Sequence, residues 1–465
     1  MPLDRLSSED ARILSLESGA IAGHTVKVLA LEAPTVGPSP TVERLRDHIT
    51  ARLDAAPRLR RRVVPTPLGL GTPVWVDDPA FDISNHVRAV HAPPPIGPAA
   101  FRAIVGELMA QRLSRGRPLW SLDVVEGLEG GCTGLVWKLH HALADGMTGM
   151  RVGGDVLWES GSQPPAPPPA RAWNPTPTPG AARLVADAAA MRARGAADEV
   201  VSAARAATDP RRLAGGAAQL ARLPVVAARE LLPDRGPAPL DRPITTARTV
   251  AFASAPLEDL RRIEHACPGT TINDVVLACV AGALRHWLTV HHAAAGDLRV
   301  KIPVSLHGRD AHTEALANRD SWLCVCLPLH EDDPMRRLAT IGAETAMRKR
   351  EHDADSLDAI MRDFAGISRR LERFAERLAA GPRMFALNVS NVPGPREPIQ
   401  VLGCRVRSMH SLAEVAQHHA LRVAAISLAG TMQFGLCADA EAVGDVETLA
   451  EGIERAVAEL LAATA

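Results

Sequence analysis

Residues 134–157 constrain the fold of this chain most, because the pattern changes there from strand to helix across a short polar loop. Residues 134–139 have the period-two pattern of a strand, and residues 147–157 carry apolar side chains at helical spacing. Between them the chain reads His-His-Ala-Leu-Ala-Asp-Gly, residues 140–146. Gly146 permits a tight turn and the close approach of a substrate. We therefore expect a strand–loop–helix unit in an α/β fold.

His140 and His141 follow the predicted strand directly. Successive side chains of a strand point to opposite faces, so only one of the two can enter a given cleft. Histidine titrates near pH ~6.5, so a neutral ring can accept a proton at physiological pH, and such a base is worth roughly 10²- to 10⁴-fold in rate. A pair that only satisfies local hydrogen bonds is the alternative. Asp145 and Gly146 favour a base that deprotonates an alcohol.

Length and charge limit the classes of function. A chain of 465 residues is long enough for two domains, each with its own core. The net charge of −1 gives the chain no electrostatic reason to bind nucleic acid. A local basic run, residues 58–62, could meet the phosphates of a ligand or an anionic membrane, although a solvated face is the favoured interpretation.

Cysteine spacing and hydropathy indicate where the protein acts. The seven cysteines are odd in number and lack Cys-x-x-Cys spacing, which favours reduced thiols in a cytosolic protein and predicts no metal site. No signal segment is visible, and no run reaches the ~18 apolar residues of a membrane span. We expect a cytoplasmic protein; if it acts on lipid, it does so peripherally, at the surface of a membrane or lipid body.

The chain divides at a Pro-rich segment. Residues 1–160 read as an N-terminal α/β domain that carries the two histidines. Residues 161–245 read as a linker, first Pro-rich and then Ala- and Arg-rich, with broken amphipathic helices from 181 to 232. These helices either pack as a crossover, which we favour, or lie on a membrane or cover a substrate tunnel. Residues 246–465 read as a second α/β domain.

Three helices and a pair of strands stand out in the second domain. Residues 271–274 open a helix whose continuation, residues 275–288, is apolar almost all round and must be buried. A helix at 368–378, a strand pair at 423–428 and 431–436, and a closing helix at 446–461 follow. Asn273 falls in the first turn of the buried helix, where a side-chain amide could stabilise a developing oxyanion, typically worth ~2.7–4 kcal/mol. Capping of the helix by Asn273 and Asp274 is an equally good interpretation.

Several further segments match a known pattern together with residues 140–146. They are the start Leu6-Ser7-Ser8-Glu9-Asp10-Ala11, Arg117-Pro118-Leu119-Trp120, Asn273-Asp274-Val275-Val276-Leu277-Ala278, Pro303-Val304-Ser305-Leu306 and Ser390-Asn391-Val392-Pro393-Gly394-Pro395. With these segments the chain resembles the bacterial wax ester synthase/diacylglycerol acyltransferase family. That family is part of the CoA-dependent acyltransferase superfamily, which includes chloramphenicol acetyltransferase and peptide-synthetase condensation domains.

The resemblance implies a fold and an activity. The fold is two chloramphenicol-acetyltransferase-like domains, each a mixed sheet flanked by helices, with a crossover linker and an interdomain tunnel. The activity is transfer of a long-chain acyl group from acyl-CoA, a co-substrate and not a bound cofactor, to diacylglycerol or a long-chain alcohol. His141 would be the general base beside His140, Asp145 and Gly146 would shape the loop, and Asn273 would stabilise the oxyanion.

The remaining candidates would line the substrate site. They are Pro118, Leu119, Trp120, Asp274, Ser390 and Asn391. Each has a structural alternative, because the Pro-Leu-Trp segment also suits an ordinary core and the Ser-Asn segment a rigid turn.

Departures from the family pattern leave other functions open. His307 stands where the family commonly has an arginine, so the partner of Asp145 is left open, and the chain has no tyrosine. Two alternatives therefore remain. One is an acyltransferase of the same superfamily with a polyketide or amine acceptor, and the other is a catalytically weak lipid-binding surface protein.

Overall fold

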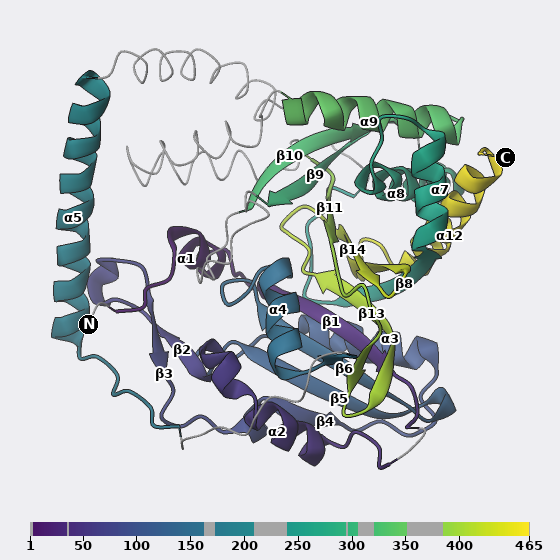
Figure 1. The fold of residues 1–465 in the computed structure, drawn as a ribbon. Coiled ribbons are helices and arrows are strands. Elements are labelled where there is room, and N and C mark those ends of the chain that lie inside the picture. Colours follow the sequence, from purple (N-terminus) through teal and green to yellow (C-terminus); the bar gives the residue numbers. More distant parts are fainter. Residues whose placement is uncertain are drawn as a thin grey trace.

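Two β-sheets, one above the other in Figure 1, form the framework of the molecule. The computed structural model describes residues 3–34, 37–161, 173–208, 240–293, 296–305, 320–350 and 385–464. The predicted helix at 368–378 lies outside these residues, as does residue 307. Within them, helices cover both sheets, which confirms the α/β class.

The first sheet has seven strands in the order β4-β5-β6-β1-β13-β12-β7. Their bounds are β1 His24–Leu31, β4 Val87–Val90, β5 Trp120–Leu128, β6 Cys132–His140, β7 Glu159–Ser160, β12 Ile399–Val401 and β13 Cys404–Ala413. One face packs on α3 (Pro98–Ala110), and the other packs on α2 (Val42–Thr50) and α4 (Gly146–Val156). Alternate residues of β6 enter the two cores, with Val136 on the α3 side and Trp137 on the α4 side.

The second sheet has six strands in the order β10-β9-β11-β14-β15-β8. Their bounds are β8 Arg248–Pro256, β9 Leu298–Ser305, β10 Asp320–Leu327, β11 Leu387–Val392, β14 Leu421–Leu428 and β15 Thr431–Asp439. Helices α7 (Leu257–Ala266), α8 (Ile272–Val290), α9 (Pro334–Arg350) and α12 (Val446–Ala462) cover its outer face. Because α8 packs against other helices as well as against the sheet, it is buried on nearly all sides. The predicted buried helix is therefore confirmed.

β13 joins the two halves. Although β12 and β13 come late in the chain, both lie in the first sheet, where β13 pairs antiparallel with β1 from Thr25↔Ala413 to Leu31↔Val406. β13 also lies against β15: a Cβ placed on Gly435 would come within 2.1 Å of the Ser411 carbonyl oxygen. The two sheets therefore meet at glycine-sized spacing.

The described part of the linker contains one long helix, α5 (Ala181–Thr208), which stands along one side of the molecule in Figure 1. Its first turns are anchored to the first half. Leu184 packs on Val74 and Val76 of the small β2 (Arg61–Val64) and β3 (Val74–Asp77) sheet, and Asp187 pairs with Arg5 at 2.7 Å. None of the helices described in the structure is long and apolar enough to cross a membrane.

The basic run at 58–62 is neutralised locally. Arg61 pairs with Asp4 at 2.9 Å and Asp77 at 3.0 Å, and Arg60 pairs with Asp54. Paired guanidiniums are poorly available to a phosphate, so the run is best explained as part of the surface framework.

Candidate active site

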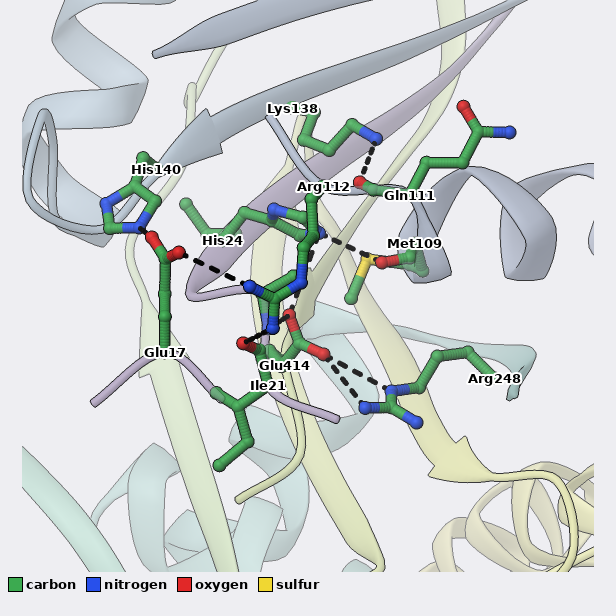
Figure 2. A network of polar contacts seen from close by, with 12 residues as sticks. Glu17, Ile21, His24, Met109, Gln111, Arg112, Lys138, His140, Arg248 and Glu414 are labelled. Atoms are coloured by element: carbon green, nitrogen blue, oxygen red, sulfur yellow. Dashed lines mark hydrogen bonds and ion pairs between the residues drawn. The ribbon is translucent and has the colours of Figure 1, made fainter. Parts of the chain in front are cut away.

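The end of β6 fixes the two histidines in different environments. The backbone N–H of His140 donates to the Leu119 carbonyl at 3.0 Å, and its ring is buried. Nδ1 of that ring accepts the Ala142 N–H at 3.0 Å. Since an amide N–H can only donate, Nε2 carries the ring proton and donates it to Glu17 Oε1 at 2.6 Å (Figure 2).

Glu17 belongs to the loop between α1 (Ser8–Ser15) and β1. Its carboxylate also pairs with Arg115 at 2.9 Å and with Arg112 at 3.7 Å, and the second pair is drawn in Figure 2. Burial acts to raise the pKa of Glu17, but the hydrogen bond from His140 and the charge of Arg115 hold the pKa below its usual value. Glu17 is therefore a carboxylate that orients His140.

Gly23 closes this loop against the histidines. Its φ of +74° lies in the left-handed region, and a Cβ there would come within 2.8 Å of His140 Nε2. Its carbonyl accepts the His141 N–H at 2.9 Å. Only glycine adopts this positive φ readily and also leaves room for the His140 ring.

His141 is half-buried and lies near cations of both halves. Burial lowers its pKa well below the ordinary value, and Arg422 of β14, then His140 and Lys27, lower the pKa further. The ring is consequently neutral at physiological pH, the state that a general base requires.

Asp145 begins α4. It is the N-cap residue, and its Oδ1 accepts the Thr148 N–H at 2.6 Å. The nearby buried cation is Lys27, whose Nζ donates to Ser411 Oγ at 2.6 Å. Burial lowers the pKa of Lys27 to about 8, while the charge of Asp145 acts to raise it. Lys27 thus supplies positive charge near Asp145.

Gly146 brings the histidine loop against the second sheet. A Cβ on Gly146 would come within 2.9 Å of Val392 Cγ2 at the end of β11. Ser390, two residues earlier, shares this face of β11, whereas Asn391 points to the other face. Beyond β11, the Gly394 N–H donates to Ser427 Oγ at 3.1 Å and fixes the turn. Ser390 therefore lies on the side that faces His141, and its contact with substrate stays a prediction.

Asp274 and Asn273 play different parts in the first turn of α8. Thr271 and Asp274 form a capping box, and Thr345 donates to the second oxygen of Asp274 at 2.7 Å. This buried carboxylate is fully occupied, so it holds the helix end. Asn273 is left half-buried beside it. No hydrogen bond joins Asn273 to the histidine loop in the described part of the chain, and its oxyanion role stays a prediction.

The Pro-Leu-Trp segment belongs to the buried core that supports the site. Pro118, Leu119 and Trp120 are all buried. Trp120 Nε1 donates to the Leu59 carbonyl at 2.8 Å, and its ring stacks on His86 with centroids 4.6 Å apart. Because the Leu119 carbonyl also holds His140, this core segment positions the histidine strand, which favours the structural alternative.

A buried ionic network ties the two halves together beside the site. Arg248 of β8 pairs with Glu414 at 3.1 Å (Figure 2). Glu414 Oε2 also accepts the Ala22 N–H at 3.2 Å. Glu414 also lies 3.6 Å from His24, whose pKa falls to about 3 because its ring is buried near Lys138. The loop carrying Glu17 is thereby held to both sheets.

Sequence reasoning missed Glu17, Lys27 and Arg422. Lys27 and Arg422 had a usable signal, because each is a lone cation within an apolar strand and must be accommodated inside. Glu17 had no such signal, because it stands in a loop and meets His140 only in three dimensions.

The chain matches two models of one protein family. The model of the wax ester synthase/diacylglycerol acyltransferase catalytic domain matches residues 6–276, and that of the WS/DGAT C-terminal domain matches residues 316–461. The chain belongs to the wax ester synthase/diacylglycerol acyltransferase family. It is accordingly an acyltransferase, and the resemblance seen in the sequence is confirmed.

Relatives support the same family across the whole chain. A Mycobacterium tuberculosis protein named as a diacylglycerol O-acyltransferase is 34% identical over 478 residues, covering 99% of this chain and 97% of its own. A second from the same organism is 31% identical over 474 residues, with coverage of 99% and 96%.

Solved structures confirm the fold. The wax ester synthase/diacylglycerol acyltransferase from Marinobacter aquaeolei VT8 superposes with a TM-score of 0.70 at 22% identity, covering 99% of this chain and 100% of that one. The starter condensation domain of rhizomide synthetase, solved with C8-CoA and Leu-SNAC, superposes with a TM-score of 0.56 at 13% identity, with coverage of 100% and 94%. The predicted chloramphenicol-acetyltransferase-like fold is therefore correct.

Proposed function

We propose that this family member transfers a long-chain acyl group from acyl-CoA to diacylglycerol, to a long-chain alcohol, or to both, with His141 as the general base. The observation that carries the proposal is the environment of His141. Its half-buried ring has a pKa well below the ordinary value and lies near charges from both sheets. Curated relatives named as diacylglycerol O-acyltransferases support the acceptor class.

The chemistry follows from a neutral base and needs no enzyme nucleophile. His141 removes the proton from the acceptor hydroxyl as its oxygen attacks the thioester carbonyl carbon. The carbon–sulfur bond then breaks, and His141 returns the proton to the departing CoA thiolate. The products are an ester and free CoA.

The neighbouring residues position this base. Glu17 holds His140 at 2.6 Å, and Gly23 holds the His141 backbone at 2.9 Å. Asp145 orients the loop as the cap of α4. Asn273 is the proposed donor to the oxyanion. We place the protein in the cytoplasm, peripherally associated with membrane or lipid bodies, where its lipid substrates collect.

The test is an acyl-transfer assay with labelled palmitoyl-CoA and either hexadecanol or diacylglycerol. Wild type should form labelled lipid ester, and His141→Ala should lose nearly all of it. His265→Ala changes an exposed histidine of α7 and is the matched control. Equal ester yield from wild type and His141→Ala would remove His141 as the base. CoA release with an amine acceptor, without any ester from hexadecanol or diacylglycerol, would favour an acyltransferase of the same superfamily with another acceptor. Lipid binding without CoA release would favour a lipid-binding surface protein.

A further inference from the structure

A row of polar side chains crosses the inner face of the second sheet. The register aligns Lys301 of β9 with Asn388 of β11, and Asn388 with Arg422 of β14. Aligned residues on neighbouring strands project from the same face, and strands lie about 4.8 Å apart, so the two cations begin about 10 Å from each other. Helix α8 covers the opposite face, where Val300 and Val423 enter the core.

This row faces the His141 side of the molecule. Arg422 is the leading charged group that lowers the pKa of His141. Farther along β11 on the same face, Val392 contacts Gly146 of the histidine loop. Asn388 and Val392 are four residues apart, so the row lies about 13 Å along the strand from that contact. That span suits a substrate that extends from the base.

The polar atoms of the row are incompletely satisfied. Asn388 Oδ1 and Arg422 Nε are buried without a hydrogen-bond partner among the described residues. Lys301 Nζ lies over the rings of Trp322 and Phe385, 4.5 and 5.3 Å from their centroids. No hydrogen bond or ion pair to this ammonium occurs within the described ranges. Buried groups of this kind are costly unless a ligand completes them.

The side chains that could meet a substrate are deep in the structure but not completely buried. His141, Lys301 and Arg422 each keep part of their surface accessible, although burial is the leading cause of the lowered pKa of each. A pKa shift caused mainly by burial requires that most of the side chain is removed from water. These three side chains are therefore mostly removed from water without being completely covered by the described residues.

We propose that Lys301 and Arg422 bind the ester carbonyls of a diacylglycerol acceptor and so make this chain selective for glycerides over simple alcohols. The inference rests on the proposed acyl transfer to a lipid hydroxyl. An alkanol is bare hydrocarbon beyond its hydroxyl group and would offer no acceptor to the Lys301 ammonium or to Arg422 Nε, although Arg422 Nη1 already donates to the Glu414 carbonyl at 3.1 Å. Diacylglycerol carries two ester carbonyls that accept from an ammonium or a guanidinium, and the amide of Asn388 stands between them.

A matched pair of acceptors isolates this contact. 1,2-Dioctanoylglycerol and 1,2-di-O-octylglycerol share the free hydroxyl and both chains, but the diether lacks the carbonyl oxygens. With labelled palmitoyl-CoA, wild type should favour the diester in kcat/KM. Lys301→Met keeps an unbranched apolar stem against Trp322 and Phe385 and should lower the diester-to-diether ratio about ten- to a hundredfold. Lys349→Met, the same change at an exposed position of α9, should leave the ratio as in wild type.

Binding without turnover separates this inference from the proposed function. Calorimetric titration of each glycerol into wild type and Lys301→Met, without acyl-CoA, should show the same loss of preference in Kd. Absence of any ester product alongside a Lys301-dependent binding preference would refute the transfer reaction and keep the site. An unchanged ratio in Lys301→Met, shown folded by urea unfolding, overturns the site. So does a rise confined to the KM for palmitoyl-CoA, which would assign the cation to the CoA phosphates.

Discussion

Replacing Glu17 tests whether the histidine loop is held by a buried hydrogen bond. Glu17→Ala removes the acceptor 2.6 Å from His140 Nε2 and leaves that N–H buried and unsatisfied. An unsatisfied buried donor costs about 1–3 kcal/mol. The ion pairs to Arg112 and Arg115 involve exposed guanidiniums and add ~0–1 kcal/mol each. We expect Glu17→Ala to lose about 2–3 kcal/mol of the free energy of unfolding.

Glu17→Gln separates geometry from charge. The glutamine keeps an oxygen that accepts from His140 Nε2, so only the charge-assisted part of the bond is lost, about 1 kcal/mol. The rate of acyl transfer should also fall more in Glu17→Ala than in Glu17→Gln. The ring of His140 holds the Ala142 N–H, so releasing it lets the His141 turn shift, and a displacement of ~1 Å can cost 10²-fold in rate.

The measurements are urea unfolding followed by fluorescence and CoA release from palmitoyl-CoA with a saturating acceptor. Glu451→Ala, at an exposed position of α12, is the control for loss of a carboxylate. If Glu17→Ala unfolds at the same urea concentration as Glu451→Ala and releases CoA as fast, the hydrogen bond between Glu17 and His140 does not hold the loop.

Three further outcomes are expected. Arg422→Met removes a positive charge that lowers the pKa of His141, so the acid limb of the kcat/KM profile should move to higher pH, because the base is active only when neutral; an unmoved limb would mean that another group limits the rate. Gly146→Ala places a methyl group 2.9 Å from a valine of β11 and should cost about 1–3 kcal/mol in urea unfolding; wild-type stability would show that the halves are not packed closely there. Asp145→Asn should lower the free energy of unfolding by about 1 kcal/mol, because asparagine can still cap α4 but removes the negative charge beside Lys27 and the N-terminus of the helix. Asn273→Ala should change it by less than ~0.5 kcal/mol, since α8 is capped by other residues; equal losses would contradict the two roles.

Local patterns predicted the elements that carry the site. The alternation before His140 corresponds to β6, the apolar run at 275–288 lies in α8, and the closing helix is α12. Each of these elements announces itself within one window of sequence, because burial of one face or of all faces dictates which side chains are apolar.

Pairing across the chain could not be predicted. Glu17 meets His140 across 123 positions, and Ser411 meets Lys27 across 384. No window contains both partners, so the cation near Asp145 could not be named in advance. The placement of β13 between β1 and β12 is non-local for the same reason.

That placement has a consequence for the integrity of the N-terminal half. Without residues 399–413, β1 would end its sheet with a full row of unsatisfied N–H and C=O groups over His24–Leu31, the kind of open margin that recruits strands from other molecules. A gene truncated near the Pro-rich segment should therefore give aggregates, although it encodes both histidines. By pairing with β1, β13 protects this edge of the sheet from strands of other molecules.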